Sequence, residues 1–358
     1  MAEYHEYYKG KRILVTGGAG AIGSRLVRHL TDAGASMVMI LDNLSSGYRW
    51  NLPAAPNMLL VEGDVIDEIR LKRVFVERPQ VVFHLAAFFA NQNSVDHPES
   101  DLSTNGLGTL RLLEYANLVG IERFVYASSG CSIYGSAAPL PLREEFMSMN
   151  LTSPYQITKM LGELYCNFFF NHHRLPVVKT RFFNSYGPGE VPGQYRNVIP
   201  NFIYWALQQR PLPITGTGEE TRDFTYVEDI VDGLMRAGYF EAAIGQEMNL
   251  ASGTETVIGD LARDINALTG NTAGTTASVR RKWDTKSRLL ASVERARSLI
   301  GYTPNTPFDT GLKNTVQWFR DNWENIRGSA SFPPGMSSAV RPTDAMGVSP
   351  TPRSPQTR

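Results

Sequence analysis

The stretch "RILVTGGAGAIGSRLVRHLTDAG", residues 12–34, decides the fold. It joins a β-branched apolar run to a glycine-rich turn and then to apolar residues at helical spacing, which predicts a strand, a tight turn and a helix. The glycines are spaced G-x-x-G-x-x-G: the first allows the turn, the second lets the backbone approach a pyrophosphate, and the third lets the helix pack closely on the strand. We therefore expect a dinucleotide at the start of this helix. The candidate contacts are Gly17, Gly20, Ala21, Ile22 and Gly23.

A second apolar segment, "SMVMILDN" at residues 36–43, ends in Asp42. A carboxylate at the end of the second strand of a dinucleotide-binding unit accepts hydrogen bonds from the ribose hydroxyls of adenosine and repels a 2′-phosphate. The alternative, that Asp42 only caps a loop, is weakened by the glycines upstream. The pattern therefore predicts NAD rather than NADP as the cofactor.

Strands and helices alternate along the following chain. Short apolar runs at residues 57–65, 81–87 and 124–129 are separated by segments with helical periodicity, such as residues 103–120. This alternation predicts an α/β protein with a Rossmann-like, doubly wound parallel sheet, which we expect a smaller C-terminal α/β substrate lobe to follow. Ligands of such sheets bind at the carboxyl ends of the strands. His84, inside an apolar run, is expected to be a core residue rather than a catalyst.

Composition argues against several other classes of protein. The chain has 358 residues, of which 42% are hydrophobic, and 35 basic residues balance 35 acidic ones. Such a balance gives no reason to expect a nucleic acid or a membrane surface as partner, and no apolar stretch reaches the length of a membrane span. Two cysteines, Cys131 and Cys166, are too few for a disulfide framework or a metal cluster. We expect a cytoplasmic protein without a metal.

A candidate catalytic pair lies in "SPYQITKMLGELYCNFF", residues 153–169. Pro154 suits the first turn of a helix, and Tyr155 and Lys159 are four residues apart, so they share one helix face. An ammonium group beside a phenol favours the phenolate and lowers the tyrosine pKa. Tyr155 is therefore expected to act as a base near neutral pH, with Lys159 beside it.

Eight motifs, taken in order, resemble those of a known family. They are "TGGAGAIG" (16–23), "LDNLSSG" (41–47), "GDV" (63–65), "HLAA" (84–87), "SIYG" (132–135), "YQITK" (155–159), "RFFNSYGPG" (181–189) and "TRDFTYVED" (221–229). Together they resemble the extended short-chain dehydrogenase/reductases, specifically the NAD-dependent nucleotide-sugar epimerases and dehydratases of the UDP-glucose 4-epimerase type. The resemblance spans about residues 11–325. The ligand it implies is a nucleotide-diphosphate sugar, with a UDP-sugar favoured by family frequency.

The resemblance implies a division of the chain. Residues 11–180 would form the NAD-binding Rossmann domain, and residues 181–328 the nucleotide-sugar-binding lobe. Residues 1–10 form an N-terminal extension, and the Pro- and Ser-rich residues 329–358 are expected to be a disordered tail. Apolar residues in the helix at 153–169 exceed what one sheet contact requires, and related proteins dimerise there, so a homodimer is expected.

The resemblance also implies roles for the cofactor residues. Tyr155 would be the catalytic base, and Lys159 would hold the nicotinamide ribose. Asp42 and Asn43 would hold the adenosine ribose. The other implied contacts are Asp64 and Val65 at the adenine edge, Asn105 near the nicotinamide, and Leu85, Ala86, Ala87 and Phe182.

In the second half, the implied substrate contacts begin with the diphosphate. Asn184 resembles the asparagine and Arg222 the arginine that contact it, since a guanidinium forks onto phosphate oxygens. The segment 197–202 resembles the one that closes over the base, and Arg196 before it would meet either a sugar carboxylate or the diphosphate. The remaining substrate candidates are Ser129, Gly130, Asn197, Val198, Thr215, Arg281, Asp284 and Arg288.

The stretch "SSGCSIYG", residues 128–135, departs from the family pattern. Five residues before the glycine of "YG" the family has a catalytic Ser or Thr, whose hydroxyl bonds the sugar O4, whereas this chain has Gly130. Continued strand alternation would put Ser132 on the same face, so Ser132 or a water could replace that hydroxyl, or Gly130 could make room for the sugar. Cys131 is a further catalytic candidate, although a buried structural cysteine is favoured.

The same stretch bears on the reaction. Dehydratases and decarboxylases of this family carry carboxylates where this chain has Cys131 and Ser132, so elimination and decarboxylation lose support. An NAD-dependent 4-epimerase with a transient 4-keto intermediate is the favoured reaction. The alternatives kept open are a cysteine-assisted 3,5-epimerase, a dehydratase or decarboxylase, and a protein that binds NAD without catalysis.

Overall fold

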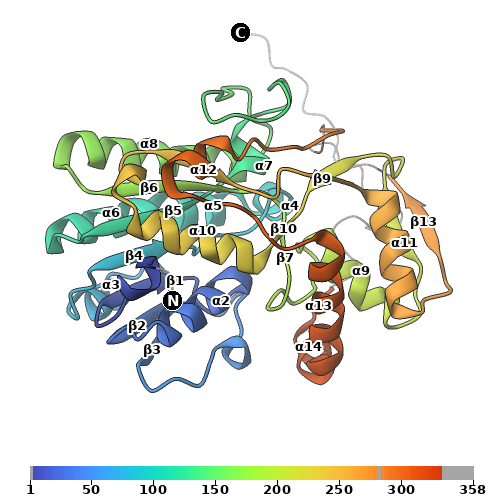
Figure 1. Ribbon diagram of the computed structural model, residues 1–358, viewed down its shortest axis with the longest axis horizontal. Helices are drawn as coiled ribbons and strands as arrows, with labels where there is room; N and C mark the ends of the chain where they lie inside the picture. Colours follow the sequence, from blue (N-terminus) through green and yellow to red (C-terminus); the bar gives the residue numbers. More distant parts are fainter. Residues whose placement is uncertain (1–2, 280–283, 285, 333–358) are drawn as a thin grey trace, which may run out of the picture.

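The computed structural model describes residues 3–279, 284 and 286–332 of the chain. At its centre lies a seven-stranded sheet in the order β11-β6-β5-β4-β1-β2-β3, and every neighbouring pair runs parallel (Figure 1). The strands are β1 (Arg12–Thr16), β2 (Met37–Asp42), β3 (Met58–Glu62), β4 (Val81–His84), β5 (Arg123–Ser129), β6 (Val177–Phe182) and β11 (Glu247–Leu250). The strand order changes direction between β1 and β4, which is the switch point where doubly wound sheets bind ligands. The predicted Rossmann-like fold is confirmed.

Two layers of helices cover the sheet. In β1, Ile13 and Val15 point to one face and pack with residues of α2 and α10, whereas Leu14 points to the other face and packs with residues of α3, α6 and α8. The bounds of these helices are α2 (Ala21–Asp32), α3 (Glu68–Phe75), α6 (Gly108–Val119), α8 (Pro154–His173) and α10 (Val227–Tyr239). Strands that are apolar on both faces fit a parallel sheet that is buried on both sides.

His84, at the end of β4, is a core residue, as expected. Its Nδ1 lies 2.7 Å from Thr16 Oγ1, and its Nε2 lies 2.9 Å from Thr109 Oγ1. Burial and, to a smaller extent, the nearby Lys159 lower the pKa of His84 to about 3. The imidazole is therefore neutral and structural.

A smaller lobe forms the other side of the molecule (Figure 1). Its helices are α9 (Val198–Ala206), α11 (Ile258–Thr269), α13 (Phe308–Asp321) and α14 (Trp323–Ser329). Its strands form three pairs, β7 (Ser185–Tyr186) with β10 (Thr225–Tyr226), β8 (Leu212–Thr215) with β13 (Thr275–Ser278), and β9 (Thr221–Asp223) with β12 (Glu255–Val257). Phe202, Trp205, Leu261 and Phe319 lie in its separate hydrophobic core. The lobe therefore has its own packing and meets the Rossmann sheet at the ligand cavity.

Short elements complete the fold. They are the helices α1 (Glu3–Glu6), α4 (Asn91–Asp96), α5 (Pro98–Asp101), α7 (Gly130–Ile133) and α12 (Glu294–Ile300), a π-helix over Leu102–Leu107, and 3₁₀ turns over Arg49–Asn51 and Glu241–Ala243. None of the helices in the part of the chain that the structure describes is both long and apolar enough to cross a membrane.

The spatial division differs from the expected boundary between residues 180 and 181. Strand β6 crosses that boundary, and α10 and β11, both from the later half, complete a helix layer and one edge of the central sheet. Residues 3–10 also pack on the first domain, because Tyr8 is buried and its hydroxyl donates to the carbonyl of Met235 at 2.5 Å. The chain returns to its first domain through contacts between residues far apart in sequence, which a linear pattern does not reveal.

The expected disordered tail was placed from residue 329 onward, but its first residues are packed. The ring of Phe332 stacks on Tyr204 with centroids 5.6 Å apart, and the N–H of Gln194 donates to the carbonyl of Ser331 at 3.0 Å. Residues 333–358, the rest of the predicted tail, lie outside the described residues.

Candidate active site

A cavity of about 440 Å³ opens at the carboxyl ends of the strands, between the Rossmann domain and the second lobe. The glycine turn after β1, Asp42 at the end of β2 and Asp64 after β3 line one part of it, and Tyr155 and Arg222 line others. This volume lies in the range of small-molecule sites. The cavity thus joins the predicted cofactor residues to the predicted substrate residues.

The glycine turn has the geometry that a pyrophosphate requires. Gly17 has φ +70, and a Cβ on it would lie 2.7 Å from the backbone nitrogen of Ala86. A Cβ on Gly23 would lie 2.2 Å from the carbonyl oxygen of Gly17, so only glycine lets α2 approach β1 so closely. Helix α2 begins at Ala21 at the cavity wall. The first N–H groups of a helix have no acceptor within it, and together with the helix dipole they favour a phosphate at this point.

Asp42 lies at the place where an adenosine ribose is recognised. Its Oδ2 accepts a hydrogen bond from the N–H of Ala19 and its Oδ1 one from the N–H of Leu44, both at 2.9 Å. Burial raises the pKa of this carboxyl, and the two backbone donors lower it. Beside it, Asn43 Nδ2 donates to Asp64 Oδ2 at 2.8 Å. The nearby Arg196 also lowers the pKa of Asp42. The cradle fits the ribose of NAD, because the Asp42 carboxylate accepts hydrogen bonds from ribose hydroxyls and repels a 2′-phosphate.

The structure brings together all but one of the predicted cofactor residues. Those that line the cavity are Gly17, Gly20, Ala21, Ile22, Gly23, Asp42, Asn43, Asp64, Val65, Leu85, Ala86, Ala87, Tyr155, Lys159 and Phe182. Asn105 does not line it. Instead, Asn105 Oδ1 accepts from the N–H of Phe88 and its Nδ2 donates to Asp101 Oδ1, both at 2.8 Å. Asn105 therefore positions the backbone that follows β4, because it lies one layer behind the cavity wall.

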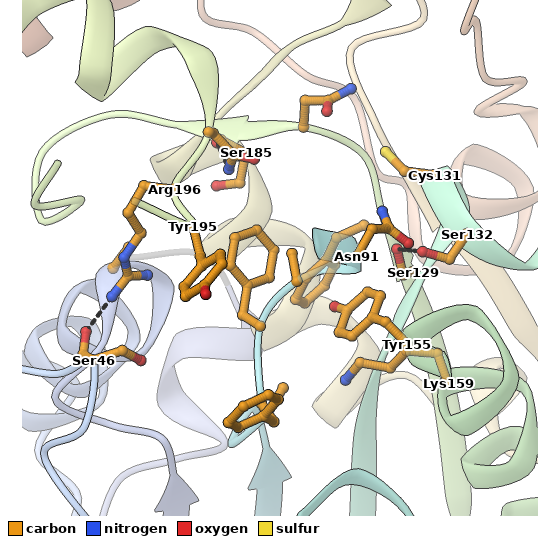
Figure 2. Close-up of a pocket in the computed structure, with 18 of the residues that line it drawn as sticks. Ser46, Asn91, Ser129, Cys131, Ser132, Tyr155, Lys159, Ser185, Tyr195 and Arg196 are labelled. Carbon is orange, nitrogen blue, oxygen red and sulfur yellow. Dashed lines mark hydrogen bonds between the residues drawn. The ribbon is translucent and has the colours of Figure 1, made fainter. Parts of the chain in front are cut away.

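Tyr155 and Lys159 lie on one face of α8 at the cavity wall (Figure 2). The helix starts where expected, since Ser153 Oγ accepts the N–H of Gln156 and Pro154 occupies the first turn. Lys159 Nζ donates to the carbonyl of Ala127 at 2.8 Å and lies 5.7 Å from the centroid of the Tyr155 ring. The strand β5 thus holds the ammonium group beside the phenol.

The expected lowering of the Tyr155 pKa by Lys159 is wrong for the chain alone. Burial raises the pKa of the Tyr155 phenol, Asp101 and Cys131 raise it further, and a hydrogen bond with Ser129 lowers it. Burial also lowers the pKa of Lys159 to about 8, so the lysine is only partly charged above neutral pH. Desolvation by burial is the largest influence on the pKa of both groups.

The serine-rich stretch does not continue as a strand. Strand β5 ends at Ser129, and Gly130–Ile133 form the helical turn α7, so the alternation that was to place Ser132 is wrong. Ser129 Oγ and Ser132 Oγ lie 2.9 Å apart, and both residues line the cavity, as does Cys131. Gly130 does not line it. A helical turn brings residues three apart to the same side, which strand alternation cannot do.

The substrate candidates divide into three groups. Those that line the cavity are Ser129, Asn184, Arg196, Asn197, Val198, Thr215, Arg222 and Asp284. Arg222 Nη2 lies 3.1 Å from Asp284 Oδ1, so the guanidinium is held by a carboxylate at the wall. Arg288 is outside the cavity, because it pairs with Glu255 and is exposed. Arg281 lies outside the described residues.

Arg196 and its neighbour Tyr195 join the two halves of the molecule across the cavity. Arg196 Nη2 donates to the carbonyl of Ser46 at 2.5 Å, which Figure 2 shows as a dashed line. Tyr195 Oη donates to Asp96 Oδ2 at 3.0 Å. Both partners belong to the Rossmann domain, so the segment that precedes α9 forms a strap over the cofactor side of the cavity.

Sequence reasoning missed several residues that line the cavity. Lys286 Nζ donates to the carbonyl of Cys131 at 2.8 Å, and burial lowers its pKa. Glu190 is buried, and burial raises its pKa to about 7. Lys286 lies two residues after Asp284 and could have been proposed with it, whereas nothing in the local pattern around Glu190 points inward.

Two buried polar groups of the cavity wall have no hydrogen-bond partner among the described residues. They are Ser128 Oγ and Trp205 Nε1, each on a residue that lines the cavity and is at most 3% exposed. A buried donor without a partner is costly, so these positions fit a polar ligand that supplies one. The described residues contain no group of three or more His, Cys, Asp or Glu side chains arranged to hold a metal ion.

The fold and this cavity define an NAD-binding Rossmann protein of the extended short-chain dehydrogenase/reductase type. Residues 13–251 match the NAD dependent epimerase/dehydratase family. The chain belongs to this family of enzymes, and its cofactor is NAD.

Three proteins illustrate what this chain is similar to. The structure resembles Epimerase Mth375 from Methanothermobacter thermautotrophicus with a TM-score of 0.91 and 58% identity, over 92% of this chain and 98% of that one. The sequence is 37% identical over 313 residues to a UDP-glucose 4-epimerase of Mycolicibacterium smegmatis, covering 87% of this chain and 99% of the relative. It is 32% identical over 321 residues to a UDP-N-acetyl-alpha-D-glucosaminuronate decarboxylase of Bacillus cytotoxicus, covering 87% and 98%. Family membership alone therefore leaves the reaction to be argued from the site.

Proposed function

We propose that this protein is an NAD-dependent 4-epimerase of nucleotide sugars, with a UDP-hexose or UDP-hexuronate as substrate. One observation carries the proposal. Tyr155 and Lys159 lie beside the NAD cradle, whereas positions 131 and 132, next to the phenol, carry a thiol and a hydroxyl and no carboxylate. Proton transfer at one hydroxyl is the chemistry that this set of groups supports.

The mechanism follows from these groups. The glycine turn after β1 and Asp42 would hold NAD, which would supply a hydride acceptor and donor for C4 and a positive ring that favours a phenolate nearby. Tyr155 Oη takes the proton of the sugar O4 as the C4 carbonyl forms and returns it when the carbonyl is reduced. Lys159, held by the Ala127 carbonyl, keeps a positive charge beside the phenol. The 4-keto sugar turns in the cavity between the two half-reactions.

The diphosphate and the nucleoside are assigned to the second lobe. Asn184 and Arg222 line the cavity at that lobe, and a guanidinium is the natural partner of phosphate oxygens. Thr215 and Trp205 line it as well, and the unpartnered indole N–H of Trp205 suits a carbonyl oxygen of the base. A UDP-sugar offers both the diphosphate and such a carbonyl.

Each competing reaction needs a catalytic group that this cavity does not provide in the required form. A dehydratase or decarboxylase of this family would use a carboxylate at positions 131 or 132. A 3,5-epimerase would use the thiolate of Cys131, but burial raises the pKa of that thiol to about 11. A protein that only binds NAD has no need of the buried Tyr155 and Lys159 beside its cofactor cradle.

The proposal is tested by product analysis in heavy water. The purified protein, without added cofactor, is incubated with UDP-glucose, UDP-glucuronate, UDP-N-acetylglucosamine and GDP-mannose, and products are identified by proton NMR. A 4-epimer without deuterium at C3 or C5 is expected, since the C4 hydrogen returns as hydride. Deuterium at C3 or C5 would indicate a 3,5-epimerase, a deoxy sugar a dehydratase, and release of carbon dioxide a decarboxylase. Each of these results would contradict the proposed 4-epimerase reaction.

We further propose that the protein is a homodimer formed through α6 and α8. These helices lie side by side, and Leu118, Leu164 and Phe168 on them are at least half exposed. A second copy of the same face would remove this apolar surface from water. Light scattering should give the mass of a dimer for the wild type and of a monomer for Phe168→Asp. Val76→Asp, at an exposed apolar site directly after α3, should stay dimeric.

A further inference from the structure

The position where the family has its catalytic hydroxyl is filled in this chain by an aromatic ring. A Cβ added to Gly130 would lie 2.0 Å from Cε2 and 2.5 Å from Cζ of Phe183. Phe183 is buried and packs against the ring of Tyr134, with centroids 6.3 Å apart. The space beside Gly130 is therefore not open to a hydroxyl-bearing side chain, nor to the sugar that a glycine was expected to admit. The hydroxyl must come from elsewhere in the cavity wall.

The hydroxyl of Ser129, one residue before Gly130, lies beside the phenol of Tyr155. Ser129 is the last residue of β5, lines the cavity and forms a hydrogen bond with Tyr155, which lowers the pKa of the phenol against the larger effect of burial. Figure 2 shows Ser129 close to Tyr155, with Ser132 joined to it by a dashed line. A sugar hydroxyl that reaches Tyr155 Oη would thus also meet Ser129 Oγ.

Ser132 controls the direction of that hydroxyl. Its side chain is fully buried, and its Oγ lies 2.9 Å from Ser129 Oγ. A serine hydroxyl has one proton and two lone pairs. If Ser132 donates to Ser129, Ser129 does not spend its proton on Ser132 and can turn it from Tyr155 Oη to a sugar oxygen in the cavity, and the chain of hydroxyls strengthens it as a donor.

Resting on the proposed 4-epimerase function, we propose that Ser129, and not residue 130, donates the hydrogen bond to the reacting sugar oxygen, and that Ser132 is the residue that positions it. Ser129 keeps its proton throughout. It stabilises the carbonyl oxygen at C4 as it develops, while Tyr155 carries the transferred proton. The hydroxyl that the family carries at the position of residue 130 is therefore supplied in this chain by residue 129. Ser132, one helical turn further along, holds it in place.

The test compares the variants Ser129→Ala, Ser132→Ala and the double variant. Ser129→Ala should lower kcat by about 100- to 1000-fold, as loss of a donor to a developing oxyanion does, with KM changed by less than about threefold and bound NAD unchanged. Ser132→Ala should lower kcat by about 5- to 10-fold. In the double variant, the loss of Ser132 should add no further decrease, because Ser132 acts only through Ser129.

The control variant is Thr180→Val. Thr180 is a buried hydroxyl on the neighbouring strand β6, where it donates to the carbonyl of Tyr126 and does not line the cavity. Its kcat should stay within about twofold of the wild type. A kcat of Ser129→Ala equal to that of the wild type would overturn the proposal. It would also be overturned if Ser132→Ala lowered kcat by the same factor in the wild type and in the Ser129→Ala variant.

A second readout separates this proposal from the proposed function. In protein labelled with [4-¹³C]tyrosine, the Tyr155 resonance is identified by its absence in Tyr155→Phe. It should shift in Ser129→Ala, shift less in Ser132→Ala, and stay in place in Thr180→Val. If the wild type acts on none of the nucleotide sugars, the 4-epimerase function fails, yet this spectrum still decides whether Ser129 contacts the phenol. An unchanged resonance in Ser129→Ala would reject that contact.

Discussion

Replacement of Cys131 by alanine distinguishes hydride return at C4 from proton exchange at C3 or C5. Cys131 lies in α7 between the two serines and lines the cavity near Tyr155. The cysteine-assisted 3,5-epimerase mechanism needs its thiolate as a base or its thiol as an acid. A 4-epimerase needs neither.

The magnitude follows from the surroundings of the thiol. Burial raises the pKa of Cys131 to about 11 against a smaller, lowering effect of Lys286. Lys286 Nζ donates to the backbone carbonyl of Cys131 at 2.8 Å, so this bond of the ammonium group goes to the main chain and not to the thiol. A pKa four units above pH 7 leaves about one thiol in 10,000 as thiolate. The structure therefore provides almost no base at this position.

The assay measures turnover and isotope content together. Cys131→Ala should retain turnover within about threefold, keep its NAD, and give a 4-epimer without deuterium in heavy water. Cys166→Ala is the matched control, because Cys166 is a buried free thiol on α8 that does not line the cavity.

A thiolate mechanism makes opposite predictions. Its rate would rise about tenfold for each pH unit between pH 7 and 10, since the thiolate fraction does. Loss of turnover in Cys131→Ala with NAD still bound, together with deuterium at C3 or C5 in the wild-type product, would refute the reasoning and establish a proton-exchange epimerase.

Three further predictions concern the same cavity. Tyr155→Phe should lower kcat by about 100- to 10,000-fold while NAD stays bound, and a smaller loss of turnover would remove Tyr155 as the base. Arg196→Ala removes the bond to Ser46 that joins the two halves, so bound NAD should dissociate faster in dialysis; unchanged retention would show that the strap does not hold the cofactor. Trp205→Phe keeps a ring but loses the unpartnered N–H, so the Kd for UDP by calorimetry should rise about 3- to 10-fold, and an equal Kd would place that donor away from the ligand.

The local features of the cofactor site were readable from the sequence. The strand, turn and helix at residues 12–34 are set by neighbours in the chain, since the tight turn and the close helix contact each require glycine at a fixed spacing. The same holds for Asp42 at the end of its strand. Tyr155 and Lys159 share a face because they are four residues apart in one helix.

Other residues could be assigned only from the packed structure. Asn105 was expected at the cofactor, but it lies behind the wall, where it binds the backbone of Phe88. Arg288 was expected at the substrate, yet it pairs with Glu255 outside the cavity, while Lys286 faces inward. These outcomes depend on how segments distant in the chain meet, and a pattern of charges does not contain that information.

The sequence by itself determined the cofactor cradle, the catalytic helix and the absence of a hydroxyl at Gly130, because each depends on the identity and spacing of neighbouring residues. Only the tertiary structure decided what replaces that hydroxyl. Strand β5 stops at Ser129, and the ring of Phe183, 53 positions further on than Gly130, closes the space beside the glycine. Ser132 then meets Ser129 across a helical turn instead of along a strand. Steric exclusion by a distant side chain, which no local pattern records, selects the hydroxyl that faces the phenol.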